Sequence, residues 1–274
     1  MSIDLSVPDV ISSHFVLHQL GEGIYAAISA SDAAVSNSGI IDLGHETLIF
    51  DTFQTPEAAR DLLAAAETVT GRKPAYVINS HWHEDHVGGN AVFAGIPIIA
   101  TAKTRDVMAQ QAANGSSAIE WVLPDSLFDE RHVFAGEKRR AELLTYGGGH
   151  TVSDAFLLLP DDRLAFMGDL LFAQAHLWMP DGDANEWVRN LREVEKLDIA
   201  VAVPGHGPIG TLADSALVRQ YISDLKDLAA RARAEGKTTD DVEGMPVPGP
   251  YRAWAFPDYF APNMRFVYET ALAS

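Results

Sequence analysis

The chain has 274 residues, enough for one large domain or two small ones, and its 47% apolar and 21% charged residues are typical of a globular protein. With 20 Lys and Arg against 38 Asp and Glu, its formal net charge of -18 would repel nucleic-acid phosphates and anionic membrane surfaces, so we expect neither as a partner. The absence of cysteine excludes disulfides, thiolate metal ligands and a cysteine nucleophile.

The amino-terminal stretch has no basic segment followed by an apolar one, and no apolar run approaches the length of a membrane span. If the printed sequence is the whole gene product, we expect a cytoplasmic protein. The composition predicts no oligomeric state.

In the first half of the chain, strands alternate with helices. Three early runs, β-branched or alternating and broken by Gly and Asp, predict strands at residues 23–30, 38–44 and 46–52. The segment TPE at 55–57 begins a helix with a capping hydroxyl, a proline and an acidic residue, and we expect that helix to reach Gly71. A further strand follows at 75–79, and then a strand at 96–100 leads into a helix at 101–113.

The second half begins with short strands that are separated by turns. They cover residues 141–146, 155–160 and 163–168. A helix at 184–197, a strand at 199–204 and a long amphipathic stretch at about 211–233 follow. The Gly- and Pro-rich segment 235–251 predicts a surface loop before a carboxy-terminal helix at 261–273.

The two halves therefore share one plan, in which strands are followed by a helix and then by a strand whose end carries histidine. Two sheets packed face to face, with helices on the outside, would bury this pattern, so we expect an α/β fold with two sheets. The segment from about 236 onward is too short to be a domain, and we expect residues 1–274 to form a single domain.

The most informative stretch is HWHEDHVGG at 81–89, which directly follows the strand predicted at 75–79. His81 and His83, two residues apart, could bind one metal ion, and Asp85 and His86 could reach a second. Imidazole nitrogen and carboxylate oxygen are ligands that zinc and similar divalent metals prefer. Four such residues within six positions predict a metal site rather than an ordinary polar loop.

Three more candidate ligands each follow a predicted strand. His150 ends a run of three glycines, Asp169 follows Gly168, and His206 lies between two glycines. A single histidine or aspartate in a turn is usually a turn residue, but the recurrence of this context favours metal binding. The carboxylate of Asp169 could bridge two cations about 3.5–4 Å apart. Asp154, by contrast, is expected to be a structural hydrogen-bond acceptor.

The motifs HWHEDHVGG, GGGHT, GDL and PGHG, in this order, resemble the metal-binding signature of the metallo-β-lactamase superfamily. The resemblance extends from the first strands to about Gly210. It implies a four-layer αββα sandwich with two metals at the sheet edges and a metal-bound hydroxide as nucleophile. It also implies a shared set of ligands: His81, His83 and His150 on one metal, Asp85, His86 and His206 on the other, and Asp169 between them. Asp85 and Asp169 are therefore also the expected catalytic residues.

The segments 147–160 and 180–191 look like those of the class B1 metallo-β-lactamases, but two positions depart from that class. Its second metal uses a cysteine where Asp169 stands, and the position of His86 is not a ligand there. The ligand set is similar instead to that of glyoxalase II, the lactonases and other dinuclear hydrolases.

The resemblance thus predicts a hydrolase with two zinc ions per chain that opens an amide, β-lactam, lactone or (thio)ester in a small-molecule substrate. Iron or manganese are the alternative metals. One alternative function is an iron-dependent, non-hydrolytic enzyme such as a sulfur dioxygenase, and another is a protein with a purely structural metal.

The sequence says less about the substrate pocket than about the metal site. Five residues close to the ligands in sequence could line an apolar pocket: Trp82, Phe172, His176, Trp178 and Met179. Lys103 and Arg105 could meet a substrate carboxylate, although charge on a helix surface is the more common role.

Overall fold

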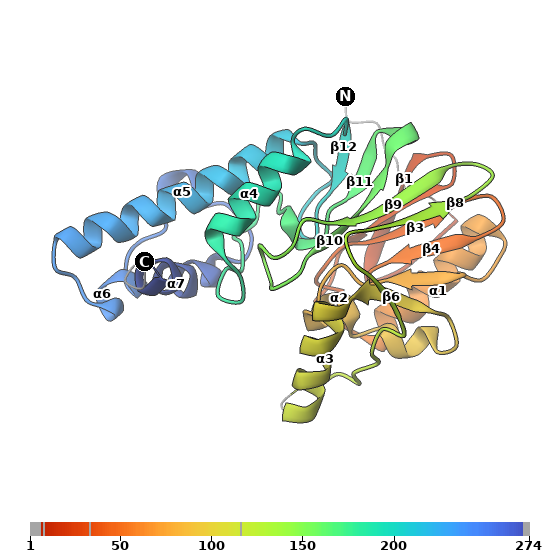
Figure 1. Cartoon of the computed structure of the whole chain (residues 1–274), viewed down its shortest axis with the longest axis horizontal. Helices are drawn as coiled ribbons and strands as arrows, with labels where there is room; N and C mark the ends of the chain where they lie inside the picture. The colour runs from red at the N-terminus through yellow and green to blue at the C-terminus, as the bar shows by residue number, and fades with distance from the viewer. Residues whose placement is uncertain (1–6, 8, 33, 116, 271–274) are drawn as a thin grey trace.

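The structure is a computed structural model, and it describes residue 7 and residues 9–32, 34–115 and 117–270. Two mixed β-sheets lie face to face at its centre, with helices on both outer sides (Figure 1). This arrangement confirms the α/β fold with two packed sheets and flanking helices that the sequence predicted.

The first sheet contains seven strands in sequence order: β1 (Phe15–Gly21), β2 (Ile24–Ser29), β3 (Ser38–Asp42), β4 (Thr47–Phe50), β5 (Tyr76–Ile78), β6 (Ile98–Thr101) and β7 (Ser126–Phe128). Strands β1 to β4 pair antiparallel, and β4 to β7 pair parallel. Since parallel strands need crossover connections, helices must return the chain between them.

The second sheet has five strands in the order β12-β11-β10-β9-β8. Their bounds are β8 (Arg131–Ala135), β9 (Arg140–Thr145), β10 (Ala155–Leu159), β11 (Leu164–Phe166) and β12 (Val201–Val203). Only the pair β11 and β12 is parallel. As a result β5, β9, β11 and β12 direct their carboxyl ends toward the same edge of the sandwich, where the candidate ligands follow them.

The helices are α1 (Pro56–Thr70), α2 (Glu84–Val87), α3 (Ala102–Asn114), α4 (Ala184–Val194), α5 (Ala213–Ala234), α6 (Thr239–Glu243) and α7 (Phe260–Thr270). Five short 3-10 helices are η1 (Asn90–Phe93), η2 (Pro160–Asp162), η3 (Gly168–Leu170), η4 (Gly249–Tyr251) and η5 (Pro257–Tyr259). Helix α1 begins as predicted, because the Thr55 side chain accepts a hydrogen bond from the Ala58 amide, and it ends at Gly71 in the left-handed conformation.

Three apolar layers hold the sandwich together. Ile41, Leu157 and Phe166 belong to the layer between the two sheets. A second layer joins the outer face of the first sheet to α1. The third joins the second sheet to α4, α5 and α7, and Trp187 and Tyr221 are fully buried in it. The burial pattern is thus that of an αββα sandwich.

Helices α5, α6 and α7 form a carboxy-terminal arm that reaches to one side of the sheets (Figure 1). The apolar residues of the arm belong to the same layer as those of the second sheet. No helix among the described residues is long and apolar enough to cross a membrane.

Most predicted elements are present, and their ends differ from the prediction by no more than three residues. Strands β1, β7 and β8 were not predicted from the sequence, and α6 lies in a segment that was expected to be a loop. Strands β7 and β8 have largely exposed faces, so their sequences lack the buried alternation on which the prediction depended. Helix α6 has a capping box between Thr238 and Asp241, a signal that was overlooked. Helix α7 ends at Thr270, and residues 271–273 of its prediction lie outside the described residues.

The close contact between the sheets depends on Gly39 in β3, where a Cβ atom would lie 2.5 Å from Cε1 of Phe166. We therefore expect Gly39→Val to lower the free energy of unfolding by about 1–3 kcal/mol through overpacking. Urea unfolding would measure this change in the free energy of unfolding. Gly249→Ala is the matched control, because a Cβ there has no neighbour within 4 Å among the described residues. Equal stability of the two variants would contradict this account of the sheet contact.

Candidate metal centre

The seven candidate ligands all follow the carboxyl ends of strands. His81 follows β5, and His83, Asp85 and His86 lie at or in the single turn of α2. The other three follow strands of the sandwich, namely His150 after β9, Asp169 in η3 after β11, and His206 after β12. The two sheets together therefore bring seven residues from four separate segments to one edge.

Two glycines allow α2 to approach the chain that follows β4. A Cβ on Gly88 would overlap the carbonyl oxygen of Gln54, and a Cβ on Gly89 would overlap that of Thr52. The Gly89 amide instead donates to the carbonyl of Phe53 at 3.1 Å. These close approaches fix α2, and with it Asp85 and His86, against the first sheet.

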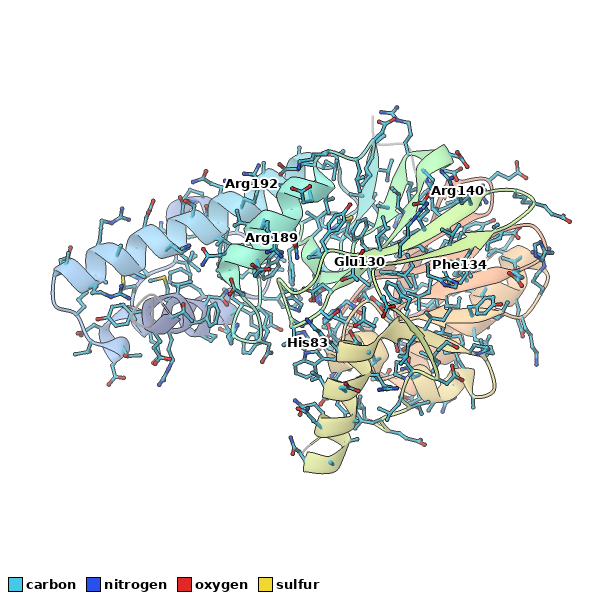
Figure 2. All side chains as sticks on the ribbon, in the orientation of Figure 1. His83, Glu130, Phe134, Arg140, Arg189 and Arg192 are labelled. Carbon is cyan, nitrogen blue, oxygen red and sulfur yellow. The ribbon has the colours of Figure 1, made fainter. Side chains whose placement is uncertain are left out.

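The ligand atoms form two groups, in each of which they lie within 4.8 Å of one another. The first group consists of His81, His83, His150 and Asp169, and the second of Asp85, His86 and His206. The first group contains the three histidines that the resemblance assigned to one metal, together with Asp169, and the second contains the three residues assigned to the other. In the view of Figure 2, His83 lies between α3 and the side of the molecule that carries α4 and the arm.

Asp169 lies between the two groups. Its Oδ2 is 3.1 Å from Nε2 of His150 in the first group and 3.3 Å from Nε2 of His206 in the second. Its Oδ1 is 3.1 Å from Nε2 of His86. One carboxylate therefore faces both groups, as expected of a residue that bridges two cations.

Several of these atoms are buried without a hydrogen-bond partner among the described residues. They include Nε2 of His81, Nε2 of His86 and Oδ1 of Asp169. Leaving a buried polar atom unpaired costs about 1–3 kcal/mol, so three such atoms within the two groups call for a further partner. Divalent cations suit this combination of imidazole and carboxylate donors, and the two clusters are consistent with a dinuclear metal site.

Electrostatics within the site favour positive charge. Burial opposes ionisation of Asp85, but His86 and His206 outweigh it and lower the pKa of Asp85 to about 2. Burial likewise disfavours the charged form of His206, yet Asp169 and Asp85 raise its pKa to about 9. The carboxylates that favour a proton on His206 would equally favour a metal cation beside it.

Residues around the ligands fix their orientation. Asp51, buried at the end of β4, accepts from Nδ1 of His86 at 2.7 Å, and also from the amide and hydroxyl of Ser80 at 2.8 and 2.7 Å. Oγ of Ser80 lies 2.9 Å from Nδ1 of His81. Nε2 of both histidines therefore points to the site, which fixes the tautomer needed for metal binding.

Asp51 was not among the site residues predicted from the sequence. Its signal was present, since a carboxylate directly after a buried apolar strand needs a partner in the fold. Asp154, in contrast, has the structural role that was predicted, accepting from the amide and hydroxyl of Thr151 at 3.1 and 2.7 Å.

Residues of the loop between η3 and α4 orient two histidines of the first group. Nε2 of His83 lies 3.1 Å from Oδ2 of Asp181, which also accepts from the indole of Trp178 at 2.7 Å. Nδ1 of His150 donates to the carbonyl of Trp178 at 2.9 Å. His83 thus presents Nδ1 to the site, while His81, His86 and His150 present Nε2.

The carboxy-terminal arm anchors this loop. The side chain of Asn263 in α7 donates to the carbonyl of Leu177 at 2.6 Å and accepts from the amide of Met179 at 2.9 Å. His176 is fully buried, with Nδ1 2.8 Å from the hydroxyl of Tyr221 in α5 and Nε2 3.1 Å from the carbonyl of Tyr251. The helices of the arm therefore help to position the residues that orient His83 and His150.

A cavity of about 320 Å³ opens beside the ligands. Its wall includes His83, Asp85, Asp169 and His206, together with the residues Trp82, Glu84, Phe172, Trp178, Asp181 and Tyr259. Of the five residues proposed for an apolar pocket, Trp82, Phe172 and Trp178 line it. His176 and Met179 are instead buried in the core, because both secure the loop to the arm.

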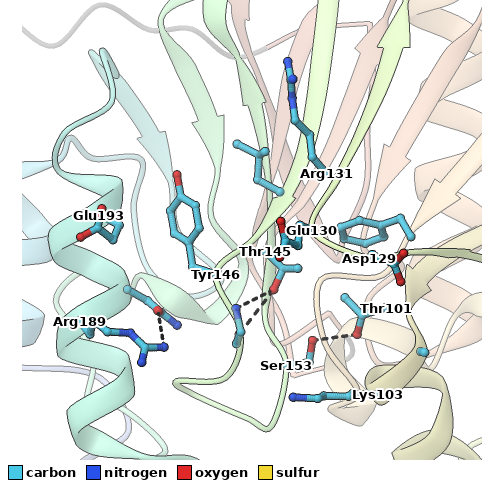
Figure 3. A pocket seen from close by; sticks show the side chains of 15 residues that line it. Thr101, Lys103, Asp129, Glu130, Arg131, Thr145, Tyr146, Ser153, Arg189 and Glu193 are labelled. Carbon is cyan, nitrogen blue, oxygen red and sulfur yellow. Dashed lines mark hydrogen bonds between the residues drawn. The ribbon is translucent and has the colours of Figure 1, made fainter.

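A second cavity, of about 890 Å³, lies between α4 and the edge of the second sheet (Figure 3). Lys103 lines it, across from Arg189 and Glu193 of α4, whereas Arg105 pairs with its neighbour Asp106 on the surface of α3. None of the seven candidate ligands, all of which are described, contributes to this cavity. A role for Lys103 or Arg105 beside the metals therefore has no support in the geometry.

A comparison with protein families agrees with the geometry. Residues 32–206, well over half of the chain, match the profile described as the metallo-beta-lactamase superfamily. The chain belongs to the metallo-β-lactamase superfamily. This membership agrees with the clustered His and Asp residues, which are consistent with a dinuclear metal site.

Curated relatives within the superfamily differ in activity. The chain is 30% identical over 162 residues to the 2,4-dinitroanisole O-demethylase subunit alpha of Nocardioides sp., covering 57% of this chain and 48% of that one. It is 24% identical to the atrochrysone carboxyl ACP thioesterase of Aspergillus fumigatus (64% and 51% covered) and 24% identical to the metallo-beta-lactamase type 2 of Bacteroides fragilis (77% and 88%). The chain thus spans about half the length of the first two relatives.

Solved metallo-β-lactamases share the fold. The enzyme from Pontibacter korlensis aligns with a TM-score of 0.66 at 22% identity, covering 76% of this chain and 98% of that one. The DIM-1 metallo-beta-lactamase aligns with a TM-score of 0.66 at 19% identity, covering 77% and 98%. Almost all of each lactamase is therefore matched, while about a quarter of this chain is additional.

The role of Asp51 can be tested on metal binding. We expect Asp51→Asn to lower zinc affinity about 10- to 100-fold, because His86 loses the charged acceptor that fixes its ring. Competition with a chromophoric chelator would measure this. The control is Asp61→Asn, since Asp61 accepts a hydrogen bond from Ser12 away from the site. Unchanged affinity in the Asp51 variant would show that its contact with His86 does not support the metal.

Proposed function

We propose that the protein is a dinuclear zinc hydrolase that attacks the carbonyl of an amide, β-lactam, lactone or (thio)ester in a small molecule. The observation that carries this proposal is the position of the Asp169 carboxylate, whose two oxygens face both groups of ligands beside an open cavity. A structural metal would not need such a cavity, because structural sites are closed by their ligands.

Zinc is the metal we propose for both positions. The donors comprise five imidazoles and two carboxylates, a nitrogen and oxygen set that zinc accepts readily. Iron and manganese accept similar donors, so metal analysis belongs to the test.

The chemistry follows from the charges that the ligands hold in place. Two bound cations would lower the pKa of a water molecule toward neutrality and polarise the substrate carbonyl. Asp85, whose side chain is 21% exposed, can orient that water as a hydrogen-bond acceptor, because its low pKa keeps it ionised. In the hydrolysis, the water oxygen bonds to the carbonyl carbon, the bond to the leaving nitrogen, oxygen or sulfur breaks, and the leaving group takes a proton from the water.

The cavity supports a small substrate with an apolar part. Its volume of about 320 Å³ is at the lower end of the range for small-molecule sites. The rings of Trp82, Phe172 and Trp178 offer apolar contacts next to the ligands. Among the relatives, a thioesterase and a β-lactamase indicate which acyl compounds should be tried first.

Zinc-loaded protein should hydrolyse at least one member of a panel of β-lactams, lactones, aryl esters and thioesters. Protein purified without added metal should contain close to two zinc ions per chain, and a chelator should abolish the activity, which zinc would then restore. A single iron with no hydrolysis across the panel would refute the proposal and favour a non-hydrolytic iron enzyme.

A single substitution can show whether the metal site is catalytic or structural. We expect Asp85→Ala to reduce kcat/KM at least about 100-fold, the scale on which loss of one charge-stabilising group acts. Asp106→Ala, which removes a surface ion pair on α3, should retain full activity. Undiminished hydrolysis by the Asp85 variant would remove the assigned mechanism.

A further inference from the structure

The chain segment just before α7 supplies one wall of the metal cavity. Tyr259, the last residue of η5, lines the cavity together with Asp85, Asp169 and His206. It lies more than fifty residues beyond the end of the family match at residue 206. The superfamily signature therefore does not account for it.

Aromatic contacts fix the ring of Tyr259 at this wall. It meets the ring of Trp178 edge-on at 5.2 Å and stacks on the ring of Phe256 at 5.2 Å with an interplanar angle of 15°. Phe256 in turn meets the ring of the ligand His206 at 5.4 Å. Tyr259 is thus packed between the loop that orients the first group and a ligand of the second.

The backbone of this segment is tied to the same loop. The amide of Ala255 donates to the carbonyl of Gln174 at 2.9 Å, and the amide of His176 donates to the carbonyl of Ala255 at 2.9 Å. Phe256 then adopts a left-handed conformation, with φ of 56°, which turns the chain into η5. The position of Tyr259 is therefore set by the two hydrogen bonds of Ala255 and by the turn at Phe256 that follows them.

The hydroxyl of Tyr259 is available to a ligand. It makes no hydrogen bond to any other described residue, and the side chain is only partly buried. A rigid ring with a free donor beside a metal centre is suited to orient a substrate oxygen.

We propose that Tyr259 is a substrate-binding residue that donates a hydrogen bond to the carbonyl or carboxylate oxygen of an acyl compound in the metal cavity. The aromatic or apolar part of that compound packs against Trp82, Phe172 and Trp178. The inference rests on the proposed function for the identity of the acyl compound, but the binding role can be tested without turnover.

The test uses phenylacetate, the acid released from a phenylacetyl ester, as a probe of the zinc-loaded protein. Tyr259→Phe keeps the ring contacts and removes only the hydroxyl. We expect it to weaken phenylacetate binding, measured by calorimetry, about 10-fold, as for loss of a hydrogen bond to a charged group. Tyr76→Phe is the control, because Tyr76 packs against Phe134 at the opposite end of β5 from His81.

Hydrolysis gives an independent readout. For any ester that the wild-type protein hydrolyses, Tyr259→Phe should lower kcat/KM about 10- to 100-fold while Tyr76→Phe leaves it unchanged. Equal phenylacetate affinity in Tyr259→Phe and wild type, or no binding by the wild type, overturns the inference. If phenylacetate binding falls as expected but no ester is hydrolysed, the proposed function fails while the binding role of Tyr259 stands.

Discussion

The clustering of five imidazoles and two carboxylates, most of them buried, at one edge of the sandwich is the constraint on which the other features depend. Charged and polar groups removed from water are stable only when each has a partner. Residues around the site provide some of these partners. Asp51 accepts a hydrogen bond from one ring nitrogen of His86, and Asp181 accepts one from His83, so that the opposite ring nitrogens face the site. Among the described residues, Nε2 of His81, Nε2 of His86 and Oδ1 of Asp169 still make no hydrogen bond, a condition under which divalent cations stabilise a fold as well as a reaction.

The carboxy-terminal arm is part of the same system. Asn263 and Tyr221 hold the loop that carries Trp178 and Asp181, and that loop orients two ligands of the first group. The arm also shares its apolar layer with the second sheet. A few hydrogen bonds therefore couple the packing of α5 and α7 to the positions of the candidate metal ligands. These two helices contribute none of the seven candidate ligands themselves.

The sequence predicted the fold class and the stretch 81–89 because local patterns encode them: strand periodicity, capping residues and closely spaced donors. It could not reveal Asp51, Asp181 or Tyr259 as parts of the site, because their roles arise from contacts across 35, 98 and more than 50 residues of chain. The exposed strands β7 and β8 could not be predicted for a similar reason. They are strands because they pair with neighbouring strands, and their own composition does not indicate this.

The apolar layer shared by the second sheet and the arm has a consequence for protein engineering. A shortened chain that ended near residue 206, where the family match ends, would keep all the candidate ligands. It would nevertheless expose the face on which Trp187 and Leu191 are buried, and a contiguous apolar surface of that kind promotes aggregation. In this protein, variants meant to change the metal site would have to be expressed and redesigned together with the arm that covers this face.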